Sequence, residues 1–470
     1  MQRPPRRGFA GKGRDGSAVR AKHSGASQGH RFSVAPARAV AFALLQQVAA
    51  GDAHSDELLR LRQVNALTAQ DRNLATTLVM GTLRWQMALD VVVLPLLARP
   101  DQEVALPVLT ALRLGAFQLL HLDRVPAHAV LNDSVELVKQ TDEYGAAGMV
   151  NAVLRKIAAM PKGAGRDAVA AHPMWMVERW RKFYGDEAAQ AICNYDQHES
   201  TVALWMEDPF AGQELEIEGV ECAPGELLAG AVRVVKGDVT RTVPYGQGRA
   251  RVQDEGSQLV AELAAAAMPE AVEVLDACAA PGGKTAILAE RLAKAKITAM
   301  EVRPRRLEAM RRNLKAHAKQ VECVEGDATA LKDGADYDLI LCDAPCSGTG
   351  TMGRNPEIRW RVDEAELHRQ QARQVEILKG AARAVRRGGR VVYSTCSLEP
   401  EENEDVVRVV VAETGLRVVP VVEVVGRMSA AGLFAAGGEE IVLGAVTDDF
   451  LRTLPGVQPC DGFFVAVLES

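Results

Sequence analysis

The chain has 470 residues, of which 48% are hydrophobic and 25% are charged. This length accommodates two to four domains of roughly 150 residues each, and the composition is ordinary for a protein with sizeable cores. Aromatic residues make up only 4%, which argues against a surface that binds single strands by repeated base stacking. The 8 cysteines are scattered along the chain, unlike those of a small disulfide scaffold, so we expect free thiols and a cytoplasmic location.

The first residues form a basic segment. Eight lysines and arginines precede residue 32, against Asp15 alone, so a tail of +7 in a chain of -6 leaves -13 for the remainder. Residues 1–34 are also rich in Gly and Ser, and such a segment cannot bury enough apolar surface to fold alone. We therefore predict a disordered tail, which either is a solvated extension or supplies salt-sensitive attraction to phosphates.

The apolar run Ala39–Leu45 that follows this tail imitates a secretory signal. However, the basic stretch before it is too long for a signal, and Gln46 and Gln47 interrupt the apolar run at once. No apolar run approaches the roughly 20 residues that a membrane-spanning helix needs. The sequence therefore predicts the first helix of a domain and no membrane partner.

Residues 35–160 have helical periodicity throughout. Apolar residues recur three and four positions apart in Leu74–Met80 and again in Val108–Leu114. This pattern predicts an all-α bundle. Bundles of this kind are mostly interaction modules, and no residue in this one indicates catalysis.

Residues 166–248 follow a short linker at Pro161–Gly165 and have a mixed pattern. Apolar residues at helical spacing in Trp175–Phe183 predict a short amphipathic helix. The brief alternating runs Leu215–Ile217 and Val232–Val235 favour strands. We therefore predict a small α+β subdomain.

Residues 249–470 alternate between strand-like and helix-like segments. The predicted strands are Ala271–Leu275, Ile297–Val302, Val321–Val324, Tyr337–Cys342 and Arg390–Ser394, and the predicted helices lie near 284–294, 304–317, 364–386 and 401–413. Such βαβ alternation indicates an α/β domain with a mainly parallel, doubly wound, Rossmann-like sheet. Ligands of these sheets bind beyond the carboxyl ends of the strands.

A glycine-rich turn follows the first of these strands. Asp276 ends the strand, and Gly282 and Gly283 allow a ligand to approach the backbone before a helix begins near Lys284. Free N–H groups at a helix start favour negative charge, such as a carboxylate. A phosphate-binding P-loop is excluded because it requires glycine five positions before Gly283, where Cys278 stands.

Acidic residues end the next two strands. Glu301 stands where a doubly wound nucleotide domain places an acid that accepts ribose hydroxyls. Asp327 follows the third strand and could hold an adenine amine. Each acid alone is equally consistent with a polar cap, but their order along the sheet favours a nucleoside-containing cofactor.

Two cysteines follow the last two strands, in Asp343–Cys346 and Ser394–Ser397. A thiolate can attack carbon 6 of a pyrimidine, which makes carbon 5 nucleophilic toward a methyl group on a sulfonium donor. Such a reaction requires a nucleophile, an acid that holds a ring or exocyclic nitrogen, and a group that assists release. Cys396, Asp343 and Cys346 are available for these roles, so the residues point to methyl transfer to a pyrimidine.

The other cysteines of this region have a plainer interpretation. Cys278, Cys323 and Cys342 follow or interrupt apolar strand residues, and we expect them to be buried packing residues. Cys342 and Cys346 have the spacing of half a zinc site, but no second ligand pair with suitable spacing is present. We therefore expect no metal.

Four segments together resemble the Sun family of RNA 5-methylcytosine methyltransferases, and two more resemble the NusB-type RNA-binding bundle. The four are Asp276–Thr285, Asp343–Gly350, Arg354–Trp360 and Ser394–Asn403, and the two are Val125–Asn132 and Val150–Arg155. A NusB-like bundle ahead of a Sun domain is the layout of the RsmB branch, bacterial enzymes that methylate carbon 5 of cytosine in small-subunit (16S) ribosomal RNA. The resemblance runs from about residue 35 to the end and includes Asp461–Phe464.

The resemblance implies a role for each motif residue. Cys396 would be the nucleophile, Cys346 would assist product release, and Asp343 would complete the catalytic set. The implied cofactor is S-adenosyl-L-methionine, held by Cys278, Ala279, Ala280, Pro281, Gly282, Gly283, Lys284, Glu301, Asp327 and Asp343. The family commonly has aspartate where Glu301 stands, one methylene longer here, and this residue can still accept two ribose hydroxyl bonds.

The partner implied is RNA, with no obligate protein partner. Arg354, Arg359 and Arg361 are candidates for phosphate contacts, the alternative being a solvated loop. Three other functions stay open: methylation of another RNA such as tRNA, a DNA cytosine methyltransferase, and a non-catalytic RNA-binding assembly factor. Cys396 argues against the DNA enzymes, whose nucleophile is the cysteine of the Pro-Cys motif and which lack a second one.

Overall fold

The computed structural model describes residues 34–51, 54–99, 103–206 and 209–470. The predicted basic tail, residues 1–34, lies outside the described residues except for Val34. The remaining predictions of helices and strands fall largely within them.

The first part is helical, as the periodicity predicts. Its helices are α1 (Pro36–Ala49), α2 (Ser55–Leu59), α3 (Arg62–Asn65), α4 (Ala69–Val93), α5 (Leu106–His121), α6 (Ala127–Lys139) and α7 (Ala147–Ala158). Their apolar stripes meet in one core, in which Leu78, Leu112 and Leu154 are fully buried. The prediction of an all-α bundle is therefore confirmed.

Helix α4 begins with a cap and ends deep in this core. The Thr68 hydroxyl accepts a hydrogen bond from the backbone N–H of Asp71, which satisfies one free donor of the first turn. The segment Ala69–Leu96 is long and apolar enough to cross a membrane by length and composition, but 56% of its most apolar window is buried inside the protein. Burial of this kind is typical of the core helix of a bundle.

The middle part combines helices with a small antiparallel sheet. Helices α8 (Met174–Tyr184) and α9 (Asp186–Tyr195) precede strands β1 (Ala203–Met206), β2 (Glu221–Pro224), β3 (Ala231–Lys236) and β4 (Ala250–Val252), which pair in the order β2-β3-β1-β4. Helix α8 and strand β3 confirm the predictions made from Trp175–Phe183 and Val232–Val235.

One strand prediction in this part is wrong. Leu215–Ile217 belongs to helix α10 (Pro209–Ile217). Residues two apart share a face in a strand, whereas here Leu215 is fully buried and Ile217 is 84% exposed, as a helix requires. Three alternating residues were too few to distinguish the two-residue period of a strand from the 3.6-residue period of a helix. Helix α11 (Val243–Gln247) completes this part.

The last part is built on a nine-stranded sheet. Its strands are β5 (Glu273–Asp276), β6 (Lys296–Glu301), β7 (Val321–Glu325), β8 (Tyr337–Asp343), β9 (Val385–Thr395), β10 (Arg417–Val419), β11 (Val446–Thr447), β12 (Phe450–Thr453) and β13 (Phe463–Glu469). The order is β11-β12-β13-β9-β8-β5-β6-β7, with β10 also paired to β13. Strands β5 to β9 pair in parallel with one another, and β13 runs antiparallel to β9.

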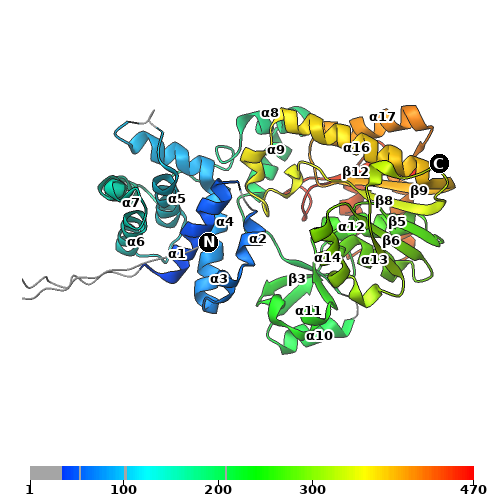
Figure 1. Cartoon of the computed structure of the whole chain (residues 1–470), viewed down its shortest axis with the longest axis horizontal. Helices are drawn as coiled ribbons and strands as arrows, with labels where there is room; N and C mark the ends of the chain where they lie inside the picture. The colour runs from blue at the N-terminus through cyan, green and yellow to red at the C-terminus, as the bar shows by residue number, and fades with distance from the viewer. Residues whose placement is uncertain (1–33, 52–53, 100–102, 207–208) are drawn as a thin grey trace, which may run out of the picture. The chain divides into compact units, whose positions relative to one another are not determined.

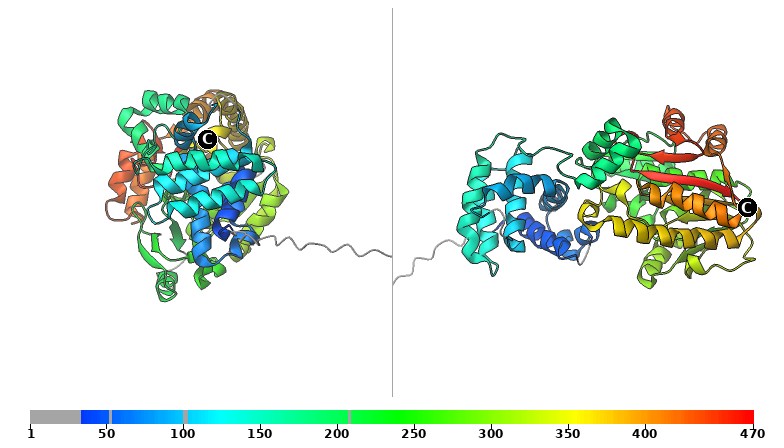
Figure 2. Two further views of the ribbon diagram at one scale, coloured as in Figure 1. Left: turned by 90° about the vertical axis from the view of Figure 1, so that its left-hand side faces the viewer. Right: turned by 90° about the horizontal axis from the view of Figure 1, so that it is seen from above.

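Helices cover both faces of this sheet (Figures 1 and 2). One face packs against α12 (Glu255–Ala267), α13 (Gly283–Arg291), α14 (Pro304–Asn313) and α18 (Val421–Ala430), and the other against α16 (Glu364–Ala384) and α17 (Glu404–Thr414). The predicted doubly wound, Rossmann-like sheet is confirmed, and all five predicted strands are present. The antiparallel strands β10 to β13 and helices α12 and α18 were not predicted.

Helix α16 approaches the sheet closely at a glycine. A Cβ atom on Gly380 would lie 2.0 Å from the carbonyl oxygen of Ala328, a backbone atom in the turn after β7. By contrast, a Cβ atom on Gly426 in the middle of α18 would meet no atom within 4 Å. Alanine substitutions at these two positions therefore distinguish the effect of helix propensity on stability from the effect of packing.

We expect Gly380→Ala to lower the melting temperature, because overpacking costs about 1–3 kcal/mol and exceeds the roughly 0.5–1 kcal/mol that alanine gains over glycine in a helix. Gly426→Ala is the matched control and should leave the melting temperature unchanged or raise it. Thermal unfolding followed by circular dichroism measures both. Equal effects of the two substitutions would contradict the packing argument.

Candidate active site

Residues of the turn between β5 and α13 line a small cavity. The N–H of Ala277 donates to the carbonyl of Leu341 on β8 (2.8 Å), and that of Ala279 donates to Met300 on β6 (2.9 Å). Gly282 has a φ of +104°, which a side chain rarely adopts, so glycine is required there. The cavity measures about 120 Å³ and is lined by Val252, Gln253, Ser257, Asp276, Cys278, Ala279, Ala280, Pro281, Gly283, Lys284 and Asp343.

Asp276 contributes a buried carboxylate to this cavity. Its Oδ2 accepts a hydrogen bond from the Thr285 hydroxyl (2.7 Å), whereas its Oδ1 is buried without a hydrogen-bond partner among the residues that the structure describes. Burial raises the pKa of Asp276 to about 7. Buried polar atoms are normally hydrogen-bonded, so this oxygen suits a donor on a bound ligand.

Glu301 and Asp327 lie at the ends of the neighbouring strands. One oxygen of Glu301 accepts from the backbone N–H of Arg303 (2.8 Å), and the other lies 3.3 Å from the Arg306 guanidinium. Asp327 accepts from the N–H (2.9 Å) and the hydroxyl (2.8 Å) of Thr329. These acids and Gly282 are not among the residues that line the cavity.

Lys284 joins the cavity to the next strand end. Its Nζ donates to Oδ2 of Asp343 (2.8 Å), and the Ser394 hydroxyl donates to Oδ1 of the same carboxylate (2.8 Å). Burial alone would lower the pKa of Lys284, but the Asp343 carboxylate outweighs burial and the pKa is raised. Asp343 is therefore held by a cation and a hydroxyl at the carboxyl ends of β8 and β9.

The two motif cysteines meet immediately beyond these strand ends. The sulfur atoms of Cys346 and Cys396 lie 3.4 Å apart, within hydrogen-bond distance. The loops that carry them are joined through backbone bonds, from the N–H of Ala344 to Ser394 (2.8 Å) and from that of Gly350 to Cys396 (2.9 Å). The hydrogen bond to Cys396 and burial raise the pKa of Cys346.

Each of these cysteines is followed by a serine that contacts one carboxylate. Glu402 accepts hydrogen bonds from the hydroxyls of Ser347 and Ser397, from the backbone N–H of Ser347 (2.8 Å) and from the Gln374 amide (3.0 Å). This carboxylate is fully buried. Glu402 therefore connects the loop that carries Cys346 with the loop that carries Cys396.

The remaining cysteines of this region differ among themselves. Cys342 is fully buried in the sheet, as predicted, and Cys323 is half-buried. Cys278 is half-buried, packs against the core and also lines the cavity, so the prediction of a buried packing residue is incomplete for Cys278. The described cysteines are all free thiols.

The predicted phosphate contact is wrong for the buried Arg359, and Arg354 has protein partners for its charge. Arg359 is 1% exposed and donates to His172 (3.1 Å) and to the carbonyl of Asp196 (3.3 Å). The Arg354 guanidinium is bound by the carboxylates of Asp461 (2.6 Å) and Asp254 (2.8 Å). Both arginines have structural partners instead.

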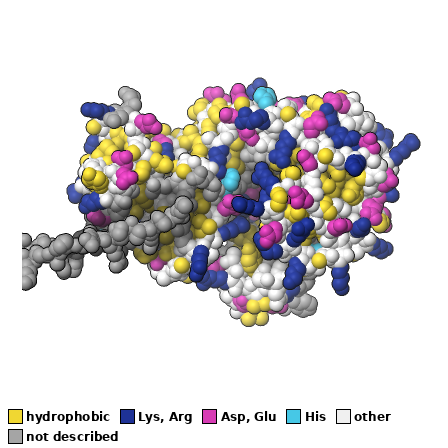
Figure 3. Space-filling model, viewed as in Figure 1, with side chains coloured by type: hydrophobic (Ala, Val, Ile, Leu, Met, Phe, Trp, Pro, Cys, Tyr) yellow, Lys and Arg dark blue, Asp and Glu magenta, His cyan; other side chains and the backbone are white. Residues whose placement is uncertain are grey.

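Arg361 likewise contacts protein atoms. It donates to the His54 imidazole (2.9 Å) and to the carbonyl of Val48 (3.4 Å). Figure 3 shows one face of the protein, on which basic and acidic side chains are interspersed and do not form a patch of one sign. On that face, phosphates would be attracted by individual basic side chains and not by a continuous basic patch.

Several residues of the site were missed by the sequence analysis. Val252 at the end of β4, Gln253 directly after it and Ser257 in the first turn of α12 line the cavity, and Glu402 contacts the cysteine loops. The polar run Gln253–Gln258 directly before an apolar helix is a signal that could have indicated the first group. For Glu402, no signal in the sequence separates it from Glu401 beside it.

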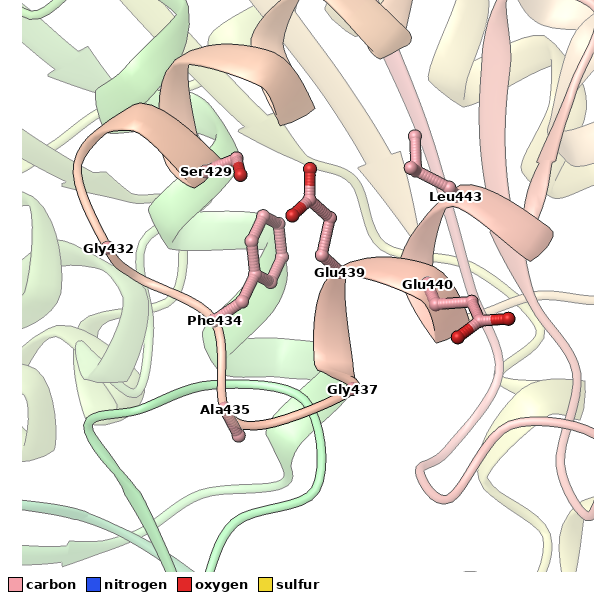
Figure 4. A pocket seen from close by; sticks show the side chains of 8 residues that line it. All are labelled: Ser429, Gly432, Phe434, Ala435, Gly437, Glu439, Glu440 and Leu443. Carbon is pink, nitrogen blue, oxygen red and sulfur yellow. The ribbon is translucent and has the colours of Figure 1, made fainter.

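A larger hollow of about 470 Å³ lies apart from this site. It is lined by Ser429, Gly432, Phe434, Ala435, Gly437, Glu439, Glu440 and Leu443 around the start of helix α19 (Gly438–Gly444) (Figure 4). Among the described residues that line it there is no cysteine and no basic side chain. The smaller cavity, by contrast, is lined by Asp276, most of the turn Cys278–Lys284, and Asp343.

Two families match the chain. Residues 35–159 match the NusB family, and residues 264–469 match the family described as 16S rRNA methyltransferase RsmB/F. A protein of Bacillus subtilis (strain 168), named probable ribosomal RNA small subunit methyltransferase B, is 32% identical over 456 residues, which cover 92% of this chain and 98% of the relative. A ribosomal RNA small subunit methyltransferase B of Xanthomonas campestris pv. campestris is 33% identical over 420 residues, covering 85% and 89%.

Solved structures agree on the fold. The crystal structure of PH0851 has a TM-score of 0.75 at 23% identity and covers 93% of this chain and 100% of its own. The crystal structure of NSun6 from Pyrococcus horikoshii with SFG has a TM-score of 0.50 at 18% identity and covers 63% of this chain and 98% of its own. At these identities the likeness establishes the fold alone.

We expect Asp276→Asn to change how stability depends on pH. The folded-state pKa of Asp276, about 7, lies above its ordinary value of 3.8, so the folded state retains a proton between these values that the unfolded state releases. Stability from this group is therefore present below about pH 4 and is lost as pH rises to about 7.

Melting temperatures of wild type and Asp276→Asn between pH 5 and pH 8 measure this effect. Asparagine cannot ionise and can still accept from Thr285, so the variant should gain stability relative to wild type as pH rises, by at most about 4 kcal/mol. A difference that stays constant across this range would contradict the raised pKa.

Proposed function

Because the chain belongs to the 16S rRNA methyltransferase RsmB/F family, we propose that it methylates carbon 5 of a cytosine in small-subunit (16S) ribosomal RNA. The observation on which this proposal depends is the pair of sulfur atoms 3.4 Å apart beside Asp343. Two adjacent thiols and a carboxylate are the groups that covalent chemistry on carbon 6 of a pyrimidine requires.

The proposed roles follow from the positions of these groups. Cys396 forms a bond to carbon 6 of the cytosine, and the electron pair displaced from the ring makes carbon 5 nucleophilic. Asp343 accepts a hydrogen bond from the exocyclic amine and orients the ring, while Lys284 holds the carboxylate in place. After methylation, Cys346 assists release by passing the proton of carbon 5 to solvent. The electron pair of that C–H bond restores the double bond between carbons 5 and 6, and the bond between carbon 6 and Cys396 breaks to leave the sulfur as a thiolate.

The proposed cofactor is S-adenosyl-L-methionine, which supplies an electrophilic methyl group on a sulfonium. The turn Cys278–Lys284 would hold it in the cavity together with Asp343, Glu301 and Asp327. The unpartnered Oδ1 of Asp276 and the close approach of backbone at the turn fit such a ligand. Glu301 and Asp327 follow adjacent parallel strands, in the order that a nucleoside would require.

The proposed partner is RNA bound by the helical bundle, and the proposed location is the cytoplasm. The boundaries 35–160, 166–248 and 249–470 are our proposal for the domains. Methylation of another RNA, such as tRNA, uses the same chemistry and differs only in the target. The contact between the sulfur atoms of Cys346 and Cys396 favours an enzyme over a non-catalytic assembly factor, because RNA binding alone requires neither thiol.

We expect Cys396→Ala to abolish methyl transfer while leaving cofactor affinity within about twofold, because the variant lacks the nucleophile. Cys346→Ser should instead accumulate a protein–RNA adduct, because release is slowed. Unmodified small-subunit rRNA with S-adenosylmethionine, analysed on a denaturing gel, measures both. Cys222→Ala, in strand β2 of the small antiparallel sheet, is the control and should form no adduct. Full turnover by Cys396→Ala would refute the nucleophile assignment.

The RNA target is a separate prediction. Wild-type protein should incorporate radioactive methyl groups into unmodified 16S rRNA and not into unmodified tRNA, since specificity for RNA normally depends on particular splayed-out bases. Methylation of tRNA in preference to 16S rRNA would support the alternative target. No incorporation into either RNA, with no adduct from Cys346→Ser, would support the binding-factor alternative.

A further inference from the structure

A single buried carboxylate connects the two cysteine loops. The residue after each cysteine is a serine, Ser347 after Cys346 and Ser397 after Cys396, and both hydroxyls donate to the same oxygen of Glu402. The two hydroxyls also lie 3.1 Å from each other. The two loops are therefore connected by Ser347, Ser397 and Glu402 as well as by the contact between the sulfur atoms.

The other oxygen of Glu402 is also satisfied. It accepts from the backbone N–H of Ser347 (2.8 Å) and from the side-chain amide of Gln374 on α16 (3.0 Å). Four donors therefore surround a carboxylate that has no exposure to solvent. A buried carboxylate with this many donors has a well-defined position, because leaving any of these buried groups without its partner is costly.

The backbone that carries Glu402 is fixed independently. The Tyr393 hydroxyl donates to the carbonyl of Glu402 (2.6 Å). Asn403 accepts from the Thr395 hydroxyl (2.6 Å) and donates to the carbonyl of Ser397 (2.9 Å). Strand β9 and the loop after it are thus tied to the segment at residues 402–403, so displacement of the Glu402 carboxylate would displace both loops.

We propose that Glu402 is a positioning residue: through Ser347 and Ser397 it holds the sulfur atoms of Cys346 and Cys396 in contact. This inference rests on the proposed function, in which Cys396 must act as the nucleophile while Cys346 waits for the release step.

The electrostatics agree with this geometry. The hydrogen bond to Cys396 raises the pKa of Cys346 most, burial adds to it, and the charge of Glu402 acts in the same direction. Loss of the contact between the two sulfur atoms would therefore move the titration of Cys346 to lower pH.

The experiment compares Glu402→Gln with Glu401→Gln. Glutamine keeps the shape of the side chain but removes the charge and replaces one acceptor by a donor. Glu401 is the neighbouring glutamate and pairs with Arg179 (2.5 Å), so its substitution is the matched control. The alkylation rates of Cys346 and Cys396 by iodoacetamide, resolved by peptide mass spectrometry from pH 6 to pH 10, give the titration of each thiol without RNA.

We expect Glu402→Gln to move the alkylation profile of Cys346 to lower pH by about one unit and to reduce turnover on RNA about 10- to 100-fold, with S-adenosylmethionine affinity unchanged. Glu401→Gln should retain both the profile and the turnover of wild type. A merely structural role for Glu402 would lower the melting temperature without changing the thiol profile. An unchanged profile in Glu402→Gln would therefore overturn the proposal.

A second variant keeps the proposal testable if Glu402→Gln does not fold. Ser397→Ala removes one hydroxyl from the carboxylate and should reduce turnover about tenfold while retaining cofactor binding, and wild-type turnover would overturn the proposal. Alkylation needs no substrate RNA, so the two proposals fail separately. A shifted thiol profile together with an enzyme inactive on every RNA would support the role of Glu402 and refute the proposed function.

Discussion

The parallel pairing of β8 with β9 is the constraint on which the site depends. In this register Asp343 lies opposite Ser394, so the carboxyl ends of both strands reach the same edge of the sheet side by side. The hydrogen bond between these two residues and the 3.4 Å contact between the sulfur atoms beyond them follow from that register. A shift of one residue would move one partner to the opposite face of the sheet and separate the thiols.

The charges of the site are stabilised by one another more than by solvent. Lys284 and Asp343 form a largely buried ion pair, and Glu402 has four donors instead of a cation. Removing one partner of a buried pair typically costs about 3–5 kcal/mol, because a charge is left uncompensated. Despite this cost, these buried contacts hold the side chains at the ends of β8 and β9 in defined positions. In the cavity, Asp276 has the same burial but one unpartnered oxygen.

The sequence predicted what depends on local pattern and on the direction of parallel strands. Strand-end residues such as Asp276, Glu301 and Asp343 could be assigned to one edge of the sheet, and the resemblance to a family supplied the roles of the cysteines. The role of Glu402 could not be predicted, because its serine partners are 5 and 55 residues away in the sequence and come together only in the folded chain. The same holds for Arg359, which looked like a surface cation and is buried against His172, 187 residues earlier in the chain. Strand β13 was missed because a strand buried on both faces has no alternating pattern.

Close backbone contact explains why the arginine-containing segment after the Pro-Cys motif does not serve as a phosphate clamp. The N–H of Gly462 donates to Gly350 (2.8 Å), whose own N–H donates to Cys396, and a Cβ atom on Gly350 would lie 2.3 Å from the Gly462 carbonyl oxygen. This crossing brings Asp461 to Arg354, so the guanidinium pairs with a buried acid next to the cysteine loops. Arg354 is therefore already bound to protein carboxylates. In the proposed function, recognition of RNA at this site would then depend more on the fit of an extruded base between the strand ends than on general attraction to phosphates.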